Sequence, residues 1–317
     1  MKRLLFLAIA LFVGTAWAQT YPSKAIRIIV PFTPGSATDV MGRIVGERLN
    51  STWGQPVIVD NKPGAGGTIG IREGSRADAD GYTLVLVSSG HAVNHVLYKD
   101  LGYDTLKDLS AVAMLGSLPS VLIVPPTLPV NSVRELVAML KASPGKYNYA
   151  SAGVGSGAHV SLEKFNVAAG VKAVHVPLKG TPPILAETMA GRVEYAMVPA
   201  VSGMGPVRDG KVKPLAVTTS KRVAALPNVP TLGEAGLPGG ESTFWLALLA
   251  PAKTPSGIVA RINAEVNRAL NAQDVVERLA KLGTEPMSMT PSQADAFIAR
   301  EYNELGKIMR DAGLTPQ

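Results

Sequence analysis

The sequence predicts an α/β protein built as two lobes around a cleft. Three observations lead to this prediction. Short runs rich in β-branched residues alternate with segments of helical spacing, the alternation occurs in two successive units of similar size, and the chain from Gly257 to its end is helical in pattern. Strand–helix–strand alternation is typical of a parallel sheet covered by helices, and 317 residues are enough for two domains.

The first unit opens on a buried strand at 25–31 (AIRIIVP), where β-branched residues dominate. A helix is expected at 39–49, because apolar residues recur there at helical spacing. Strands are expected at 57–60 and 82–88 (YTLVLVS), and a helix begins between them at Thr68.

The second unit repeats this pattern. Ser132 is expected to cap a helix that runs through Leu140, because Glu135 stands at capping-box spacing. The other expected elements of this unit are strands at 120–125, 148–151, 173–177, 194–199 and 213–218 and helices at 159–169 and 184–190.

The last part of the chain is expected to return to the first unit, which lacks a closing element of its own. It consists of an apolar strand at 244–250 and helices at 258–269, 274–282 and 291–312. The prediction is a discontinuous first domain (19–119 and 242–317), an inserted second domain (120–241) and two strands that cross between them. A cleft between the domains is the expected place for a ligand.

The N-terminus has the pattern of a secretory signal peptide. Lys2 and Arg3 precede an apolar run at 4–13, and Ala16-Trp17-Ala18 is a small-x-small cleavage site. The run is too short to span a bilayer, so we expect cleavage after Ala18 and a mature protein in the periplasm. The sequence contains no Cys, which excludes disulfides, thiolate chemistry and lipid attachment through Cys.

The net charge of +7 is weak evidence about partners. The Lys and Arg residues are scattered, and no basic run indicates nucleic acid or a membrane surface. No nucleic-acid partner is expected, and a mild attraction for acidic solutes is the most that this charge favours.

Four loops carry the candidate chemistry, because each follows an expected strand, where ligands bind in open α/β sheets. In the loop at 31–39, Ser36, Ala37 and Thr38 lie near a helix N-terminus, whose unpaired N–H groups suit a carboxylate. Thr38 or Asp39 alternatively caps the helix, and capping is the expected role of Asp39, because its charge would repel an anion. Phe32 belongs to the same loop.

The loop at 61–68 has three glycines in four residues just before a helix. Gly66 and Gly67 leave room for a ligand to touch the backbone, or they make a tight turn without one.

The third loop, Ser88-Ser89-Gly90-His91, ends a strand with hydroxyl and N–H groups that suit a ligand oxygen. His91 alternatively caps or packs. His91 and His95 have an i, i+4 spacing that can hold zinc, but no Cys, Asp or Glu nearby completes the site, so no metal is expected.

The fourth loop, Ser151 to His159, contains Gly153 and Ser156 and is similar to a phosphate-cradling loop. The next expected strand ends without the acidic residue of a dinucleotide site, and the Lys-Ser/Thr ending of a P-loop is absent. No nucleotide or other cofactor is therefore expected, whereas anion binding is. His159 caps, packs or donates to the ligand. Lys179, on the following loop, neutralises an acid or is solvated.

No motif marks a catalytic nucleophile, since Gly-x-Ser-x-Gly and Cys are both missing. A Ser-His-Asp arrangement is spatial and leaves no fixed spacing. A secreted hydrolase or lyase that uses Ser88, Ser151 or Ser156 with His91 or His159 is therefore the alternative from a different functional class.

In order and spacing, these segments resemble the substrate-binding proteins of tripartite tricarboxylate transporters, the TctC or Bug family. The resemblance covers nearly the whole mature chain. It rests on short motifs that are weak singly and specific together. They are Tyr21-Pro22 with 26–31, the loops at 34–39 and 61–67, Asp80 to Leu84, 151–159, 176–180, 216–222, 226–231 and 234–236.

The resemblance implies a type II periplasmic-binding fold that closes around its ligand like a hinged clamp. It implies that Phe32, Ser36, Ala37, Thr38, Gly66 and Gly67 hold one carboxylate, largely through backbone N–H groups and waters. Ser88, Ser89, Ser151, Gly153, Ser156 and His159 would complete the pocket.

Two positions depart from the family pattern. Ser36 stands where a second glycine is frequent, so the first loop is expected to be stiffer or to add a hydroxyl. Some relatives carry an aspartate near Tyr195 to Ala200 that meets an amino group, and Val198-Pro199 has none. This departure disfavours an amino acid and favours a plain mono- or dicarboxylate, aliphatic or aromatic.

The expected function is capture of a small carboxylate for delivery to the large and small membrane subunits of a transporter, by a monomeric protein that is not an enzyme. An alternative is a sensory adaptor that docks, when loaded, on a membrane sensor kinase.

Overall fold

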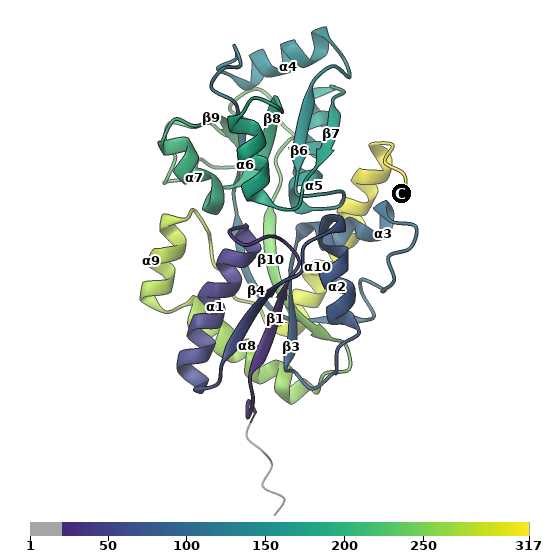
Figure 1. Ribbon diagram of the computed structural model, residues 1–317, viewed down its shortest axis with the longest axis vertical. Coiled ribbons are helices and arrows are strands. Elements are labelled where there is room, and N and C mark those ends of the chain that lie inside the picture. Colours follow the sequence, from purple (N-terminus) through teal and green to yellow (C-terminus); the bar gives the residue numbers. More distant parts are fainter. Residues whose placement is uncertain (1–20, 317) are drawn as a thin grey trace, which may run out of the picture.

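Two β-sheets, each covered by helices on both faces, divide the molecule into two lobes (Figure 1). The structure is a computed structural model that describes residues 21–316. The expected signal peptide at 1–18 and its cleavage site lie outside the described residues. The purple start and the yellow end of the chain share the lower lobe of Figure 1, whereas the teal and green middle forms the upper lobe.

The first lobe is made of elements from both ends of the described chain. These are β1 (Ile26–Val30), α1 (Ala37–Trp53), β2 (Val57–Asn61), η1 (Ala65–Gly67), α2 (Thr68–Ser75), β3 (Thr83–Ser88), η2 (Ser89–Val93), α3 (Asn94–Leu97), β4 (Leu109–Leu118), β10 (Phe244–Pro251), α8 (Ser256–Leu270), α9 (Gln273–Lys281) and α10 (Pro291–Asp311).

The second lobe is continuous in sequence. Its elements are β5 (Ser120–Val124), α4 (Val133–Ala142), β6 (Asn148–Ser151), α5 (Gly157–Ala169), β7 (Val174–Pro177), α6 (Thr181–Met189), β8 (Tyr195–Pro199), α7 (Ala200–Arg208) and β9 (Lys213–Val217).

Each sheet has five strands, in the order β2-β1-β3-β10-β4 in the first lobe and β7-β6-β8-β5-β9 in the second. Strands β1, β2 and β3 are parallel, as the sequence predicts, but β10 runs antiparallel to both β3 and β4. In the second sheet β5 is likewise antiparallel to its two neighbours. The sheets are therefore mixed, because the strands that cross between lobes enter them in the opposite direction.

Strand β10 shows why its sequence is apolar throughout. Leu246 and Leu248 face a core formed with α1 and α8, whereas Trp245 and Leu249 face a second core formed with α2 and α10. Side chains alternate across a strand, so a strand covered on both faces needs apolar residues at every position.

The helical tail covers the first sheet, as the sequence predicts. Helices α8 and α10 pack against β4. The side-chain amide of Asn263 donates to the carbonyl oxygen of Val112 at 2.8 Å, and the carboxylate of Asp295 accepts from the amide of Ala111 at 2.7 Å. These contacts connect α8 and α10 to β4, the strand that leads into the second lobe.

The chain crosses between the lobes at two places that lie side by side. Only Pro119 separates β4 from β5, and the return passes through Ser242 into β10. The hydroxyl of Thr218 accepts from the amide of Ser120, and its carbonyl oxygen accepts from the amide of Ser242, each at 3.1 Å. This pair of crossings is the place where a hinge is expected.

The sequence prediction lacks strand β4 and helices α3 and α7, besides the short 3₁₀ segments η1 and η2. Strand β4 (LSAVAMLGSL) is rich in small residues and lacks a β-branched run, so its pattern indicates no strand, and its pairing with β10 makes it one. Helix α7 contains Pro206, which disfavours a helix. Capping at Ser132 is confirmed, because its hydroxyl accepts from the amide of Glu135 at 3.2 Å.

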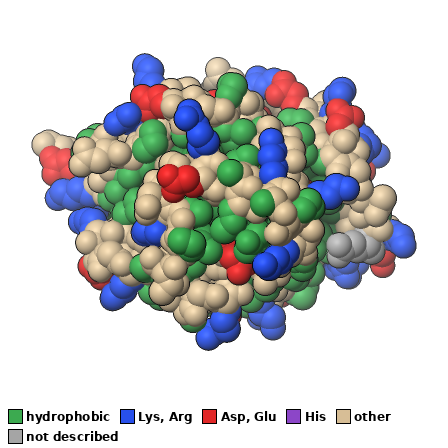
Figure 2. Space-filling view, turned by 90° about the horizontal axis from the view of Figure 1, so that it is seen from above, with side chains coloured by type: hydrophobic (Ala, Val, Ile, Leu, Met, Phe, Trp, Pro, Cys, Tyr) green, Lys and Arg blue, Asp and Glu red, His purple; other side chains and the backbone are tan. Residues whose placement is uncertain are grey.

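Charged side chains are dispersed over the face that Figure 2 shows. Figure 2 shows the end that carries the second lobe, where Lys and Arg lie apart from one another and among Asp and Glu. Within residues 21–316, no helix is both long enough and apolar enough to cross a membrane.

Candidate functional site

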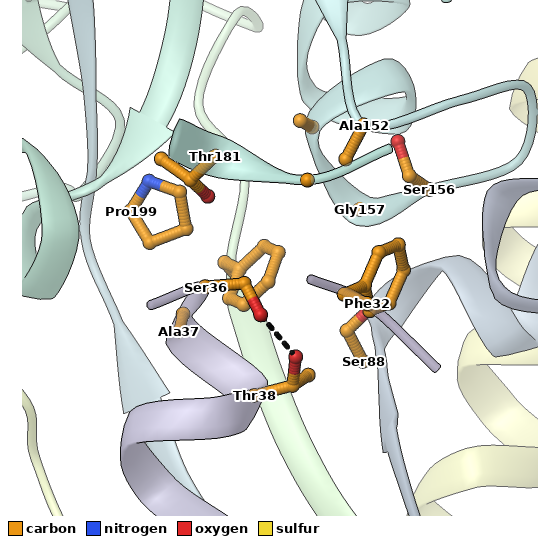
Figure 3. A pocket seen from close by; sticks show the side chains of 13 residues that line it. Phe32, Ser36, Ala37, Thr38, Ser88, Ala152, Ser156, Gly157, Thr181 and Pro199 are labelled. Carbon is orange, nitrogen blue, oxygen red and sulfur yellow. Dashed lines mark hydrogen bonds between the residues drawn. The ribbon is translucent and has the colours of Figure 1, made fainter. Parts of the chain in front are cut away.

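A pocket lies between the two lobes and takes residues from both (Figure 3). Its open space is about 300 Å³ when the solvent at its mouth is included. Thirteen residues line it. They are Phe32, Ser36, Ala37, Thr38, Ser88, Ala152, Ser156, Gly157, Ala158, Gly180, Thr181, Pro199 and Phe244.

The lining contains no charged side chain. Five residues carry hydroxyl groups, and the rings of Phe32 and Phe244 form apolar walls. Gly157 makes room for one of these rings, because a β-carbon at Gly157 would lie 2.5 Å from Cε2 of Phe244. Any charge that the pocket offers a ligand must therefore come from the backbone.

Four helices begin at this pocket. The N-cap residues of α1, α5, α6 and α7 are Ser36, Ser156, Gly180 and Pro199, and each of them lines it. A helix N-terminus carries roughly half a positive elementary charge and presents unpaired N–H groups. The convergence of four N-termini suits the pocket to an anion without a Lys or Arg.

The N-terminus of α1 has the most open donors. Its first internal hydrogen bond runs from the amide of Val40 to the carbonyl oxygen of Ser36 at 2.9 Å, so the amides of Ala37 and Thr38 precede the helical ladder. No side chain caps them. The hydroxyls of Ser36 and Thr38 lie 3.0 Å apart and bond to each other, as the dashed line in Figure 3 marks.

Asp39 holds this loop in place. Its carboxylate accepts from the amide of Gly35 at 2.9 Å, from Nε of Arg43 at 3.0 Å and from the side-chain amide of Asn61 at 3.0 Å. Burial alone would raise the pKa of Asp39, but these bonds outweigh it and hold the pKa below its usual range. The carboxylate thus braces the loop one residue before the N-cap and does not face the pocket lining.

The glycine loop before α5 is held by buried polar groups. The hydroxyl of Ser151 lies 2.6 Å from Nε2 of His175, donates to the carbonyl oxygen of Gly153 and accepts from the amide of Gly153, the last two at 3.1 Å. Nδ1 of His159 accepts from the amide of Gly155 at 3.2 Å. These side chains shape the loop from behind.

The other two helix starts in the second lobe have fewer free donors. Helix α6 carries Pro182 and Pro183 in its first turn, and proline has no N–H. In α7 the amide of Ala200 donates to the carbonyl oxygen of Pro119 at 2.9 Å. Pro199 faces the pocket, so the segment from which an acidic side chain is missing does border the ligand space.

The structure brings six of the predicted site residues together around the pocket, namely Phe32, Ser36, Ala37, Thr38, Ser88 and Ser156. The other seven, Gly66, Gly67, Ser89, Ser151, Gly153, His159 and Lys179, stand outside its lining. Gly67 packs against the ring of Phe32, since a β-carbon there would lie 3.2 Å from Cζ. The carbonyl oxygen of Lys179 accepts from the amide of Thr33 across the cleft at 3.3 Å, and its side chain is exposed.

Sequence reasoning missed seven of the lining residues, namely Ala152, Gly157, Ala158, Gly180, Thr181, Pro199 and Phe244. Gly157 and Ala158 follow Ser156 at the start of α5, so the helix N-terminus rule could have found them. No pattern in the sequence marks Phe244, which reaches the pocket from the crossing segment.

The four histidines pack inside the lobes. His91 stacks on Tyr103 and His95 on Tyr302, whereas His159 stacks on His175 with ring centroids 4.3 Å apart. Burial, followed by the neighbouring His175, lowers the pKa of His159 to about 3, and burial lowers the pKa of His175 to about 4. Among residues 21–316, no group of three or more His, Asp or Glu is placed to hold a metal ion.

Comparison with known proteins shows which family the chain is similar to. The model of the tripartite tricarboxylate transporter family receptor matches residues 41–314. Protein BugT of Bordetella pertussis is 38% identical over 99% of this chain and 98% of its own.

Two solved structures share the fold over nearly their whole length. The periplasmic binding protein BugD superposes with a TM-score of 0.89 at 31% identity, covering 94% of this chain and 100% of its own. An R. palustris protein solved with adipate gives a TM-score of 0.90 at 32% identity, again covering 94% and 100%. These likenesses confirm the expected two-lobed α/β fold.

Proposed function

The chain belongs to the tripartite tricarboxylate transporter receptor family, and from this premise we propose that it captures a small carboxylate in the pocket between its lobes and delivers it to the large and small membrane subunits of a transporter. Members of the family are periplasmic binding proteins. The proposal places this chain in the periplasm after cleavage at Ala18 and treats it as a monomer.

One observation supports the carboxylate most directly, the convergence of four helix N-termini on a pocket without charged side chains. Together they supply on the order of two positive elementary charges. This matches an acid with one or two carboxylates. One carboxylate is assigned to the amides of Ala37 and Thr38, which have no capping side chain.

The remainder of the ligand is proposed to be uncharged and without an essential amino group. Phe32, Pro199 and Phe244 contribute apolar surface to the pocket, and no carboxylate lines it to pair with an ammonium group. A buried ammonium group without a partner would be costly. Plain aliphatic or aromatic acids are therefore the proposed ligand class.

The predicted residues outside the lining are assigned supporting roles. Ser151, Gly153 and His159 shape the loop that carries Ser156. Gly67 positions the ring of Phe32, and Ser89 adjoins Gly157. The proposed lobes keep the boundaries 19–119 with 242–317, and 120–241.

The hydrolase alternative is disfavoured by the burial of Ser151, the candidate nucleophile that lies beside a histidine. Ser151 is fully buried, and its hydroxyl proton is used by the carbonyl oxygen of Gly153. The hydroxyl also lies 2.6 Å from Nε2 of His175, a histidine outside the predicted pairs, and a nucleophile that substrate cannot reach does not act. We therefore propose that the chain is not an enzyme.

Thermal unfolding of the protein purified from the periplasm, measured with succinate, adipate, citrate and benzoate, tests the proposal. At least one acid should raise the midpoint in a concentration-dependent way. The acid recovered after incubation should be intact by mass spectrometry. No shift with any acid would contradict carboxylate capture, and conversion of the acid would favour the enzyme. Cross-linking to membranes with and without the neighbouring transporter subunits or sensor kinase distinguishes transport from sensing.

A further inference from the structure

Loops of the two lobes meet backbone to backbone beside the pocket. Gly66, in η1 of the first lobe, faces the carbonyl group of Val154 in the second lobe, and Gly90, in η2, faces the carbonyl oxygen of Gly155. None of these four residues lines the pocket. The missing side chains of Gly66, Gly90 and Gly155 therefore serve something other than room for a ligand.

The approach at Gly90 is too close for any side chain. A β-carbon there would lie 2.1 Å from the carbonyl oxygen of Gly155 and 2.8 Å from the amide nitrogen of Gly157. Both atoms belong to the backbone of the second lobe and cannot rotate away. Gly90 does not have a positive φ, so the backbone conformation itself would accept alanine.

The approach at Gly66 is closer still. A β-carbon there would lie 1.7 Å from the carbonyl oxygen of Val154. The contact is reciprocal, because a β-carbon at Gly153 would lie 2.8 Å from the amide nitrogen of Gly66. The hydroxyl of Tyr98 donates to the carbonyl oxygen of Val154 across the same gap at 2.7 Å.

The three nearest atoms to a β-carbon at Gly90 all belong to the second lobe. A methyl group at this position would meet them only when the lobes are together. When the lobes separate about the crossing segments, the methyl group has free space. An alanine here should therefore act on closure and leave the folding of either lobe unchanged.

We infer that Gly66 and Gly90 are positioning residues for ligand capture: they allow the lobes to close backbone to backbone, and a side chain at either position holds the cleft open. The inference rests on the proposed function, because it needs a ligand-bound closed state. This role differs from the contact with the ligand that the glycine pattern predicts for Gly66.

The test compares Gly90→Ala with Gly257→Ala in the full periplasmic protein. Gly257 lies in α8, has no positive φ, and a β-carbon there meets nothing within 4 Å, so it controls for the chemical change alone. Adipate affinity is measured by calorimetry and the radius of gyration by small-angle X-ray scattering. Gly90→Ala should weaken adipate binding by at least about tenfold, since the closed state becomes rare. Its radius of gyration in adipate should stay at the ligand-free value.

A second pair of variants controls for a local effect of the Gly90→Ala substitution. Gly66 has φ +61° and Gly54 has φ +65°, but a β-carbon at Gly54 meets nothing within 4 Å. Alanine strains the backbone equally at both positions, and only Gly66→Ala adds the contact across the cleft. Gly66→Ala should lose affinity and compaction, whereas Gly54→Ala should lose only some stability.

The outcomes separate this inference from the proposed function. Wild-type affinity and compaction in Gly90→Ala and Gly66→Ala, when the wild type binds adipate, would overturn the inference and leave carboxylate capture standing. If the wild type binds no acid, the proposed function fails, and amide hydrogen exchange across 153–157 then decides the inference. Faster exchange there in Gly90→Ala than in the wild type and in Gly257→Ala would support the contact, and equal exchange would overturn it.

Discussion

Replacing Ala37 by proline removes one hydrogen-bond donor from the pocket and adds two ring carbons to its lining. Ala37 is the first residue of α1, a position that accepts proline because its N–H has no partner within the helix. The preceding residue, Ser36, has φ −71° and ψ 162°, which is the extended conformation that a residue before proline prefers. Ala37→Pro should therefore fold like the wild type.

The expected loss follows from the kind of bond removed. A hydrogen bond to a charged group contributes about 1.5–3 kcal/mol, which corresponds to about a ten- to hundredfold rise in the dissociation constant for adipate. The measurement is titration calorimetry, with circular dichroism and thermal unfolding as checks of folding.

The matched control is Ser256→Pro, which places proline at the same position of α8, an exposed helix start away from the pocket. It should bind adipate like the wild type. A folded Ala37→Pro protein with wild-type affinity would refute the assignment of a carboxylate to the start of α1.

Three further changes probe the cleft and the buried groups. Tyr98→Phe removes the hydrogen bond to the carbonyl oxygen of Val154 across the cleft. Because a neutral hydrogen bond contributes about 0.5–1.5 kcal/mol, the adipate dissociation constant measured by calorimetry should rise about two- to tenfold. Unchanged affinity would show that this hydrogen bond does not favour closure. Lys179→Ala should change the adipate dissociation constant less than about threefold, since an exposed charge outside the pocket lining is screened by solvent. A loss of affinity as large as that of Ala37→Pro would show that Lys179 contributes to ligand binding. Burial lowers the pKa of His91 to about 4, below the value of about 6.5 in an unfolded chain, so the unfolded state binds more protons below pH 6.5 and His91 alone should cost about 2 kcal/mol of stability between pH 7 and pH 5. The pKa values of the other three histidines are lowered as well, so the total fall should exceed this, and equal stability at the two pH values in urea unfolding would contradict the reasoning.

The parts of the fold that local sequence determines were predictable. The strand at 25–31 and the helix at 39–49 differ from β1 and α1 only at their ends, because β-branched runs and apolar spacing act over a few residues. Strand β4 was not predictable from its own residues. Its small side chains favour no local structure, and it becomes a strand by pairing with β10, which lies far away in sequence.

In the candidate site, too, the residues placed by local sequence were predictable and those placed by contacts between the lobes were not. Ser36, Ala37, Thr38 and Ser156 stand at helix starts, a position that local sequence indicates, and all four line the pocket. Phe244 and Pro199 reach the pocket only through the docking of the two lobes, which no local pattern records. The glycines at 64–67 predict either room for a ligand at the backbone or a tight turn, and the sequence does not say that the group approaching Gly66 belongs to the other lobe.

That ambiguity follows from how the site is built. An anion site that relies on helix amides needs donors from both lobes within hydrogen-bond distance of one small ligand. The donors belong to the backbone, so the backbones of the two lobes must come nearly as close to each other as to the ligand. Side chains between them would hold the lobes apart. The site binds its anion through backbone amides and not through Lys or Arg, whose long side chains could reach across a wider gap. The need for glycine at positions 66, 90, 153 and 155 then follows from this use of backbone amides. On this argument, adding a basic side chain to the pocket should relax the need for glycine at the closure contact, because the ligand could then be held without full closure.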